Sequence, residues 1–315
     1  MNVLETVLSA LNLDVIREDA KSTAVLSRQL EVARDRTYDI VYPEMKAREL
    51  IPTDNSVDPG AKTVTYAQWS DVGMAAILAN YATDLPAIDA LVEEFTSPIH
   101  GIGGSYFWSI QDIRAAALSG SDLPARKGRA ARRAIEVAIE NIAANGNAKV
   151  GLQGLTTNAN VAIVSPTTGT WAGATGAQMV GDMNKFVTSM VTTNLETFLP
   201  DTIILDIASF QLFSTTRIST TGDTHTTAMQ AFLASNPYVK NVKSWNRLAL
   251  ADAGGTGPRA ICYKKDPEVL ELIIPQEYEE MPPQANGLKF SVPAHARCGG
   301  VVIYYPIGLA YMDGL

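Results

Sequence analysis

Residues 123–146 read LPARKGRAARRAIEVAIENIAANG, and their pattern is that of a long helix. Ile135, Ile139 and Ile142 recur at spacings of four and three residues, which places them on one helical face. Because glycine commonly follows the last residue of a helix, we expect this one to end at Asn145. The stretch therefore predicts an amphipathic helix whose isoleucine face packs against the rest of the protein.

The charges on this helix run against the helix dipole. Five cations crowd its N-terminal half: Arg126, Lys127, Arg129, Arg132 and Arg133. Glu136 and Glu140 follow them, whereas the dipole prefers the reverse order by about 0.3–1 kcal/mol per exposed charge. Solvation of this face is the simpler explanation. The alternative hypothesis is that these cations contact acidic groups of a neighbouring chain, or nucleic acid.

The segment before residue 37 is predicted to be a helical arm. Apolar residues recur at helical spacing at Val3, Val7, Leu8, Leu11 and Val15, and again at Val25, Leu26, Leu30 and Ala33. Such a stripe must be buried against something, either its own domain or a neighbouring chain. The spacing leaves both possibilities open.

Residues 38–108 have the character of extended chain. Strands are predicted at 48–52 and 62–69, and a further extended stretch runs over about 88–108. A compact domain seldom contains so long an excursion without a helix unless the excursion has a function. Because exposed strand edges pair readily with other chains, we expect this segment to contact a partner.

The remainder alternates helices with short strands. Helices are predicted over 109–118, 178–195 and 208–215, with strands at 202–205, 239–245, 260–263, 269–274, 289–292 and 301–305. Residues 214–227 are rich in Ser and Thr and are predicted to form a surface loop. Asn286-Gly287 is a strong signal for a tight hairpin.

The composition is that of a folded protein that does not specialise in binding nucleic acid. The chain has 315 residues, of which 46% are hydrophobic and 18% charged, with a formal net charge of −8. Dedicated nucleic-acid binders concentrate Lys and Arg to contact phosphates, which this acidic balance disfavours. An acidic balance is nevertheless compatible with a protein that only encloses nucleic acid.

Compartment and membrane signals indicate folding in cytoplasm. Cys262 and Cys298 are predicted to be buried, reduced thiols, because two cysteines in so long a chain make no disulfide scaffold. The N-terminus lacks the basic start and apolar stretch of a signal peptide. The longest apolar run, near Val301–Met312, is interrupted by Pro306 and Gly308 and is too short to span a membrane.

Histidines and cysteines provide no recognisable site for metal or cofactor. His100, His225 and His295 lie far apart and in no metal-ligand spacing, and Asp223 beside His225 does not complete a zinc site. Neither a phosphate-binding loop nor a nucleophile elbow is found, so no catalytic, cofactor or metal residues are predicted.

Asp206 is the best candidate for an enzyme. It follows a predicted buried strand, where α/β sheets place functional groups, although it also suits the N-cap of the next helix. Several other acids are close enough in sequence to act as paired carboxylates but are interpreted as solvated faces: Glu93, Glu94, Glu277, Glu279 and Glu280.

Four local patterns, in this order, resemble a known family. They are Arg48-Glu49-Leu50-Ile51-Pro52 followed by residues 60–66, Gly103–Ser109 followed by Asp112-Ile113, Asn145-Gly146 leading to residues 151–155, and Arg297–Val301 with Pro306. Together with the arm, the excursion and the long helix, they resemble the Hong Kong 97-type capsid fold of tailed phages and encapsulins. The resemblance covers about residues 38–315.

This resemblance implies an α+β protein with a particular domain plan. It comprises an N-terminal arm (1–37), a peripheral domain (38–154 and 266–300), and an α/β axial domain with closing strands (155–265 and 301–315). The peripheral domain would include an extended loop (about 54–104) and a spine helix (about 123–145).

The implied function is structural. The chain would be a major capsid protein that forms pentamers and hexamers of an icosahedral shell, assembled in the host cytoplasm around double-stranded DNA that it does not read. Separate scaffolding, portal and decoration proteins are possible partners, and no membrane is involved. Two alternatives remain, an encapsulin-type compartment and, less favoured, an α/β hydrolase that uses Asp206.

Overall fold

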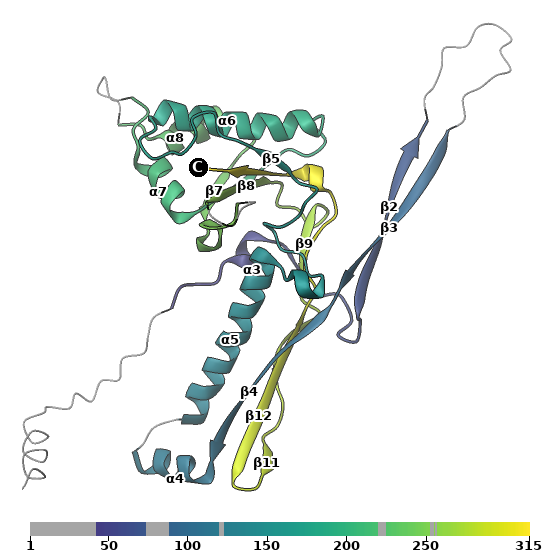
Figure 1. Cartoon of the computed structure of the whole chain (residues 1–315), viewed down its shortest axis with the longest axis vertical. Coiled ribbons are helices and arrows are strands. Elements are labelled where there is room, and N and C mark those ends of the chain that lie inside the picture. Colours follow the sequence, from purple (N-terminus) through teal and green to yellow (C-terminus); the bar gives the residue numbers. More distant parts are fainter. Residues whose placement is uncertain (1–41, 74–87, 120–122, 220–224, 253–254, 256) are drawn as a thin grey trace, which may run out of the picture. The chain divides into compact units, whose positions relative to one another are not determined.

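The computed structural model describes residues 42–73, 88–119, 123–219, 225–252, 255 and 257–315 (Figure 1). Contacts divide the chain into two units, Met1–Glu44 and Met45–Leu315. The helices and strands named below all lie in the second unit.

A mixed five-stranded sheet separates two hydrophobic cores. Its order is β5-β14-β8-β6-β7, with bounds β5 (Ala162–Val164), β6 (Thr202–Leu205), β7 (Asn241–Ser244), β8 (Arg259–Tyr263) and β14 (Leu309–Asp313). Strands β6 and β8 are buried throughout, which is typical of strands covered on both faces. Because side chains alternate along a strand, Ile203 and Cys262 point into one core. Ile204 and Ile261 point into the other.

Three helices cover one face of this sheet (Figure 1): α6 (Gly176–Thr193), α7 (Ile207–Thr215) and α8 (Ala228–Ser235). Met183 and Phe186 of α6 are completely buried in the core between these helices and the sheet. Capping boxes start α6 at Thr175 and α8 at Thr227, where each threonine side chain accepts a backbone N–H that the helix leaves unpaired. Local sequence therefore determines where these helices begin, and their apolar faces determine what they cover.

The other core contains the long helix. Helix α5 (Leu123–Asn145) lies alongside β4 (His100–Ser109) and β12 (Lys289–Cys298), and α4 (Ile110–Ser119) follows β4 (Figure 1). Strands β4 and β12 pair antiparallel over their whole length, and β10 (Gln276–Glu280) and β11 (Gln284–Asn286) also pair with β12. Ile135 and Ile139 are buried in this core, and Gly146 takes the left-handed conformation that ends the helix (φ +65°).

Small elements complete this part of the chain. They are α3 (Ala47–Leu50), the three-stranded sheet β1-β9-β13 with β1 (Thr53–Asp54), β9 (Leu270–Ile273) and β13 (Gly300–Ile303), and the 3-10 turns η2 (Ala148–Val150), η3 (Asn246–Leu248) and η4 (Pro306–Gly308).

A long hairpin is formed by β2 (Thr63–Val72) and β3 (Asp89–Pro98). The two strands pair in register from Thr63 opposite Pro98 to Val72 opposite Asp89. Tyr66 anchors its base, because its ring stacks on Phe95 at 5.4 Å between centroids and meets the edge of Tyr304 at 4.8 Å. Beyond that point both strands are exposed apart from the half-buried Gln68.

Most of the predicted elements are confirmed, including the helices over 109–118, 178–195 and 208–215 and the hairpin at Asn286-Gly287. The strand predicted at 48–52 is wrong, because Ala47–Leu50 is helical. A carboxylate from α5 caps this turn, and no local pattern could have indicated that. The extended loop predicted at about 54–104 spans two sheets, because its residues from His100 onward pair with β12. The predicted arm lies outside the described residues.

Candidate assembly surfaces

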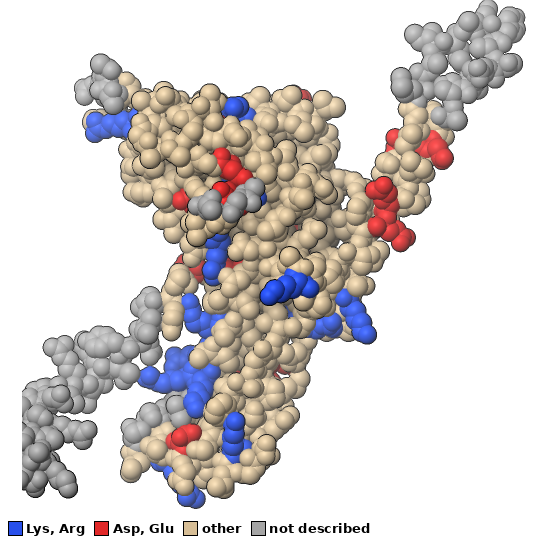
Figure 2. All heavy atoms as spheres, viewed as in Figure 1, with Lys and Arg blue, Asp and Glu red and all other residues tan. Residues whose placement is uncertain are grey.

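The hairpin surface, meaning strands β2 and β3, is acidic and apolar. Its strands contain carboxylates but neither Lys nor Arg: Asp71, Asp89, Glu93 and Glu94 (Figure 2). Trp69 is 69% exposed and its cross-strand neighbour Val92 is 49% exposed. Exposed aromatic and aliphatic side chains that lie next to one another commonly mark a protein contact.

The hairpin also has two open edges. Among the described residues β2 and β3 form a two-stranded sheet, so the outer backbone groups of each strand have no strand partner there. An isolated hairpin is marginally stable in water, and open edges tend to pair with other chains. The hairpin is therefore a candidate site for contact with another chain.

The predicted cations on α5 divide into two groups. Lys127 donates a 2.7 Å hydrogen bond to the carbonyl of Phe107, and the Arg132 guanidinium lies 5.9 Å from the ring centre of Tyr278. The other three form the arginine stripe: Arg126, Arg129 and Arg133. At 100° per residue they fall within about 60° of one helical face. Arg126 and Arg129 are exposed and Arg133 is half-buried, and basic side chains gather on this part of the surface (Figure 2).

Lys289 is a further cation that sequence reasoning missed. Lys289 lies on β12, which pairs with β4, and its Nζ is 3.7 Å from the ring centre of Phe107 on β4. A cation over an aromatic face is a favourable contact. This one forms because the distant strands β4 and β12 pair with each other. The residue follows the Asn286-Gly287 turn, and nothing in its local sequence indicates this contact.

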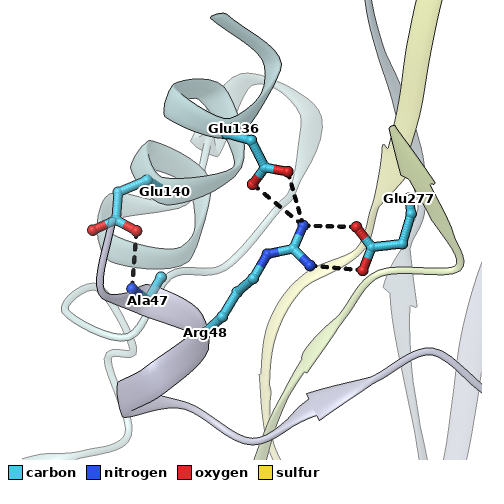
Figure 3. A network of polar contacts seen from close by, with 5 residues as sticks. All are labelled: Ala47, Arg48, Glu136, Glu140 and Glu277. Carbon is cyan, nitrogen blue, oxygen red and sulfur yellow. Dashed lines mark hydrogen bonds and ion pairs between the residues drawn. The ribbon is translucent and has the colours of Figure 1, made fainter. Parts of the chain in front are cut away.

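Helix α3 is capped by a buried carboxylate of α5 (Figure 3). Glu140 accepts hydrogen bonds from the backbone nitrogens of Ala47 (2.9 Å) and Lys46 (3.3 Å). It also accepts one from Nε1 of Trp245 (2.6 Å). Glu140 is only 3% exposed, so these donors replace water around the charge.

Arg48 joins α3 to two further acids (Figure 3). Its guanidinium binds Glu277 of β10 through two bonds of 2.6 and 2.8 Å, and it lies 3.3 Å from Glu136 of α5. The hydrogen bond with Arg48 lowers the pKa of Glu277, and that with Glu277 raises the pKa of Arg48. Glu277 is exposed, in agreement with its interpretation as part of a solvated face, and it is also the partner of a cation.

The other clustered acids do not converge on a common site. Glu279 accepts a hydrogen bond from Gln276, and Glu280 accepts one from Tyr278, each at 2.5 Å. Glu93 and Glu94 are consecutive strand residues, so their side chains point to opposite faces of the hairpin.

The histidines are also dispersed. His100 bonds to the carbonyl of Val150 at 3.0 Å, His295 lies 4.0 Å from Glu279, and His225 is exposed. Within the described residues no three His, Cys, Asp or Glu side chains gather closely enough to hold a metal ion. Asp223 lies outside the described residues.

Asp206 is the N-cap of α7. Its carboxylate accepts the backbone N–H of Ala208 at 2.9 Å and that of Ser209 at 3.3 Å. The capping interpretation is thus confirmed. The side chain is 4% exposed and is occupied by the helix terminus, so it is poorly placed to act on a substrate.

Cys262 and Cys298 are buried and not joined by a disulfide, as predicted. Burial raises the pKa of both thiols, which makes them unreactive. Across the part of the chain that is described, no helix combines the length and apolar character needed to cross a membrane.

An exposed hairpin with open edges, a long helix with cations at its start and an α/β sheet domain are features that suit a protein subunit associating with other chains. The sequence model of the major capsid protein family matches residues 73–315. The chain therefore belongs to the major capsid protein family, and it is a shell-forming capsid protein with the Hong Kong 97-type fold.

Solved capsid structures share this fold at low sequence identity. The capsid of Myoviridae phage XM1 matches with a TM-score of 0.82 and 16% identity, covering 92% of this chain and 98% of that one. The capsid of a native GTA particle matches with a TM-score of 0.65 and 11% identity, covering 94% and 99%. A chain from Mycobacterium phage Bobi matches with a TM-score of 0.62 and 13% identity, covering 94% and 98%. The search of curated proteins found no match.

Proposed function

We propose that the shell built by this protein encloses double-stranded phage DNA without reading its sequence, and that the protein has no catalytic role. The observation that carries assembly into a shell is the β2–β3 hairpin. Its open edges and exposed apolar side chains favour a partner chain. The net charge of −8 suits a container that does not hold DNA tightly. The hydrolase alternative loses its candidate residue, because Asp206 caps α7.

The proposed domain plan is the one implied by the family resemblance. Residues 1–37 form the arm, 38–154 with 266–300 the peripheral domain, and 155–265 with 301–315 the axial domain. The core that contains Met183 and Phe186 lies wholly within the proposed axial domain, which is consistent with this plan, whereas the core that contains Ile135 and Ile139 includes residues of both proposed domains. Copies would form pentamers and hexamers in the host cytoplasm, with separate scaffolding, portal and decoration proteins as further partners.

We assign the arginine stripe of α5 to the contact between neighbouring copies. The stripe presents positive charge, whereas β2 and β3 together contain four carboxylates and no Lys or Arg. Opposite surface charges guide association and select its register. The arginines lie on a helix and the carboxylates on paired strands, so the distances within each charged group are the same in every copy.

The spacings of the two charge groups are compatible. Arg126 and Arg133 are seven residues apart, which corresponds to about 10 Å along a helix. Asp71 lies opposite Ala90 and Glu94 opposite Ala67 on the same hairpin face, which places the two acids about 13 Å apart along the strands. Exposed Trp69 lies between them and would be buried by the contact.

Charge reversal tests this assignment in the full chain. One variant changes Arg126, Arg129 and Arg133 to Glu, and a second changes Asp71 and Glu94 to Lys. We expect each alone to lower the yield of shells in electron micrographs at least tenfold, and the combined variant to recover most of it. Lys240→Glu, a change at an exposed cation of the axial part, is the matched control and should assemble normally.

Two results would contradict the assignment. Failure of the combined variant to recover assembly would show that the two groups do not meet. Normal shells of the arginine variant with reduced DNA content would instead place the stripe against the enclosed DNA.

A further inference from the structure

The turn that ends α6 holds two consecutive residues other than glycine in the left-handed conformation. Leu195 has a φ of +50° and Glu196 a φ of +63°. Side chains other than glycine seldom adopt such angles, because Cβ then comes too close to the following carbonyl oxygen. Glycine or asparagine is the usual residue at such a helix end. The backbone is therefore strained at this turn.

The strained turn presents an apolar side chain to solvent. Leu195 is 86% exposed, so burial within its own copy does not offset the strain. Asn194 holds the turn beside η4, because its Nδ2 donates to the carbonyls of Phe198 at 2.6 Å and Ile307 at 3.5 Å. Its Oδ1 is buried without a hydrogen-bond partner in the described part of the chain, which is a further cost. Backbone strain of this kind commonly marks a functional surface.

Leu195 belongs to a group of exposed apolar residues at this turn and at η4. We call the group the corner surface, and its members are Leu195, Leu199, Tyr305 and Ile307. The ring of Tyr305 packs on that of Phe198 at 5.2 Å between centroids, and Asn194 links the turn to η4, so the group lies in one place. Exposed apolar side chains that gather in this way commonly mark a protein contact.

A shallow groove of about 460 Å³ lies between α7 and η3. Its lining residues are Asp206, Ile207, Ala208, Gln211, Asn246 and Ala249. Ile207 is 58% exposed, and Leu250, next in the chain to the last of these, is 67% exposed. The groove lies at the β7 edge of the five-stranded sheet, because α7 packs on β7, whereas η4 of the corner surface adjoins β14, near the β5 edge (Figure 1). The two apolar surfaces therefore belong to opposite edges of one sheet.

The charges beside the two surfaces are complementary. Glu196 is exposed next to Leu195, and the segments 194–199 and 304–308 that form the corner surface contain neither Lys nor Arg. Arg247 lies in η3 beside the groove and is half-buried, and its Nε is buried without a hydrogen-bond partner among the described residues. Guanidinium groups bind carboxylates in preference to neutral acceptors. The groove therefore suits an apolar side chain that is accompanied by an acid.

We propose that the corner surface of one copy docks into the α7–η3 groove of the next copy, with Leu195 seated against Ile207 and Glu196 paired with Arg247. The contact rests on the proposed shell function and names two of the surfaces that meet. Because it joins different surfaces at opposite edges of the sheet, it can repeat from copy to copy, as head-to-tail contacts do. Burial of the Leu195 side chain in the groove then offsets the strain of its backbone.

Leu195→Asn separates the strain from the contact. Asparagine tolerates the left-handed conformation, so the unassembled variant should unfold about 2–4 °C higher than the unaltered chain. Its yield of shells in electron micrographs should nevertheless fall at least tenfold, because the apolar contact is lost. Leu288→Asn is the matched control, since it changes a leucine of similar exposure (71%) outside both surfaces, and it should assemble normally. Normal shells of Leu195→Asn, or a lower unfolding temperature, would overturn the proposal.

A disulfide between copies tests the pairing of the two surfaces. Leu195→Cys and Ala249→Cys are made as separate variants and co-assembled, each as a minor fraction, with the unaltered chain. After oxidation by copper phenanthroline in air, we expect linked pairs of chains on denaturing gels. Shells that contain only one of the two variants should give none, because the natural thiols Cys262 and Cys298 are buried.

The outcomes distinguish the contact from the shell function. Shells that contain both cysteine variants but give no linked pairs would overturn the proposed contact and leave the shell function intact. Absence of shells from the unaltered chain would contradict the shell function, whereas the unfolding temperature of unassembled Leu195→Asn would still show whether the turn is strained.

Discussion

The hydroxyl of Tyr304 donates a 3.0 Å hydrogen bond to the carboxylate of Glu271. The edge of the same tyrosine ring packs on Tyr66 at the base of the hairpin. A half-buried carboxylate of β9 thus binds the tyrosine that contacts the base of the hairpin. Burial raises the pKa of Glu271, and the nearby charge of Asp54 raises it further.

We expect Glu271→Gln to stabilise the protein at neutral pH. A carboxylate whose pKa is raised in the folded state binds its proton more tightly there, so its contribution to stability falls as pH rises through that pKa. Glutamine has no charge to lose and still accepts the Tyr304 hydroxyl. The free energy of unfolding of the variant, relative to that of the unaltered protein, should therefore rise between about pH 4 and pH 7. If the difference in unfolding free energy between the two proteins does not vary with pH, burial of the Glu271 charge is not the cause of the stabilisation.

Gly154→Ala should prevent normal folding of the turn after α5. A Cβ at this position would collide with the backbone of Gly146 and Ala144, which cannot move without breaking the end of the helix. We expect a loss of more than about 2 kcal/mol in unfolding free energy, measured by urea denaturation. Gly181→Ala in α6 is the control, because no atom lies within 4 Å of its added Cβ, and it should stabilise the protein by about 0.5–1 kcal/mol.

Arg259→Met should cost about 3–5 kcal/mol of unfolding free energy, because it removes the buried guanidinium that Asp313 binds. The Arg259 guanidinium, 4% exposed, binds both Asp313 oxygens at 2.6 and 2.7 Å and donates to the carbonyl of Thr156 at 2.5 Å. Lys264→Met, in an exposed pair, should cost less than about 1 kcal/mol in the same urea titration. Equal losses in the two variants would show that burial does not distinguish these pairs.

Asp206→Ala should lower the unfolding free energy by about 0.5–2 kcal/mol, the usual effect of removing an N-cap. Asp206→Asn should lose far less, since asparagine caps helices nearly as well, and should form shells in normal yield. Thermal unfolding and electron microscopy check these outcomes. An enzymatic activity that disappears in Asp206→Asn while shells still form would restore the hydrolase alternative.

Sequence patterns predicted the helices, strands and turns that interactions between nearby residues determine. The periodicity of Ile135 and Ile139 is sufficient for α5, because neighbouring turns of a helix make the face that is buried. The hairpin predicted at Asn286-Gly287 is likewise determined locally. Asn286 pairs with Lys289, so Gly287 and Leu288 form the turn, and Gly287 takes the positive φ of 63°. Strand β10, strand β14 and helix α8 were not predicted.

The division of the cations on α5 required the tertiary structure. The sequence shows five cations in one half of a helix, but only the fold brings Lys127 to Phe107 and Arg132 to Tyr278. Arg126, Arg129 and Arg133 form the stripe on which the proposed contact rests. Sequence spacing defines the face that each cation occupies, whereas packing determines which residues of distant elements lie next to it.

By itself, the sequence determined the class of fold, the long helix, the extended excursion and the shell-forming role of the protein. Only the tertiary structure decided that Ala47–Leu50 is a helix and that Arg48 pairs with Glu277, 229 residues away in the chain. The physical reason is the range of the interactions. Periodicity and turn chemistry act over a few residues, whereas a buried cap such as Glu140 or an ion pair between distant strands exists only after the chain has folded.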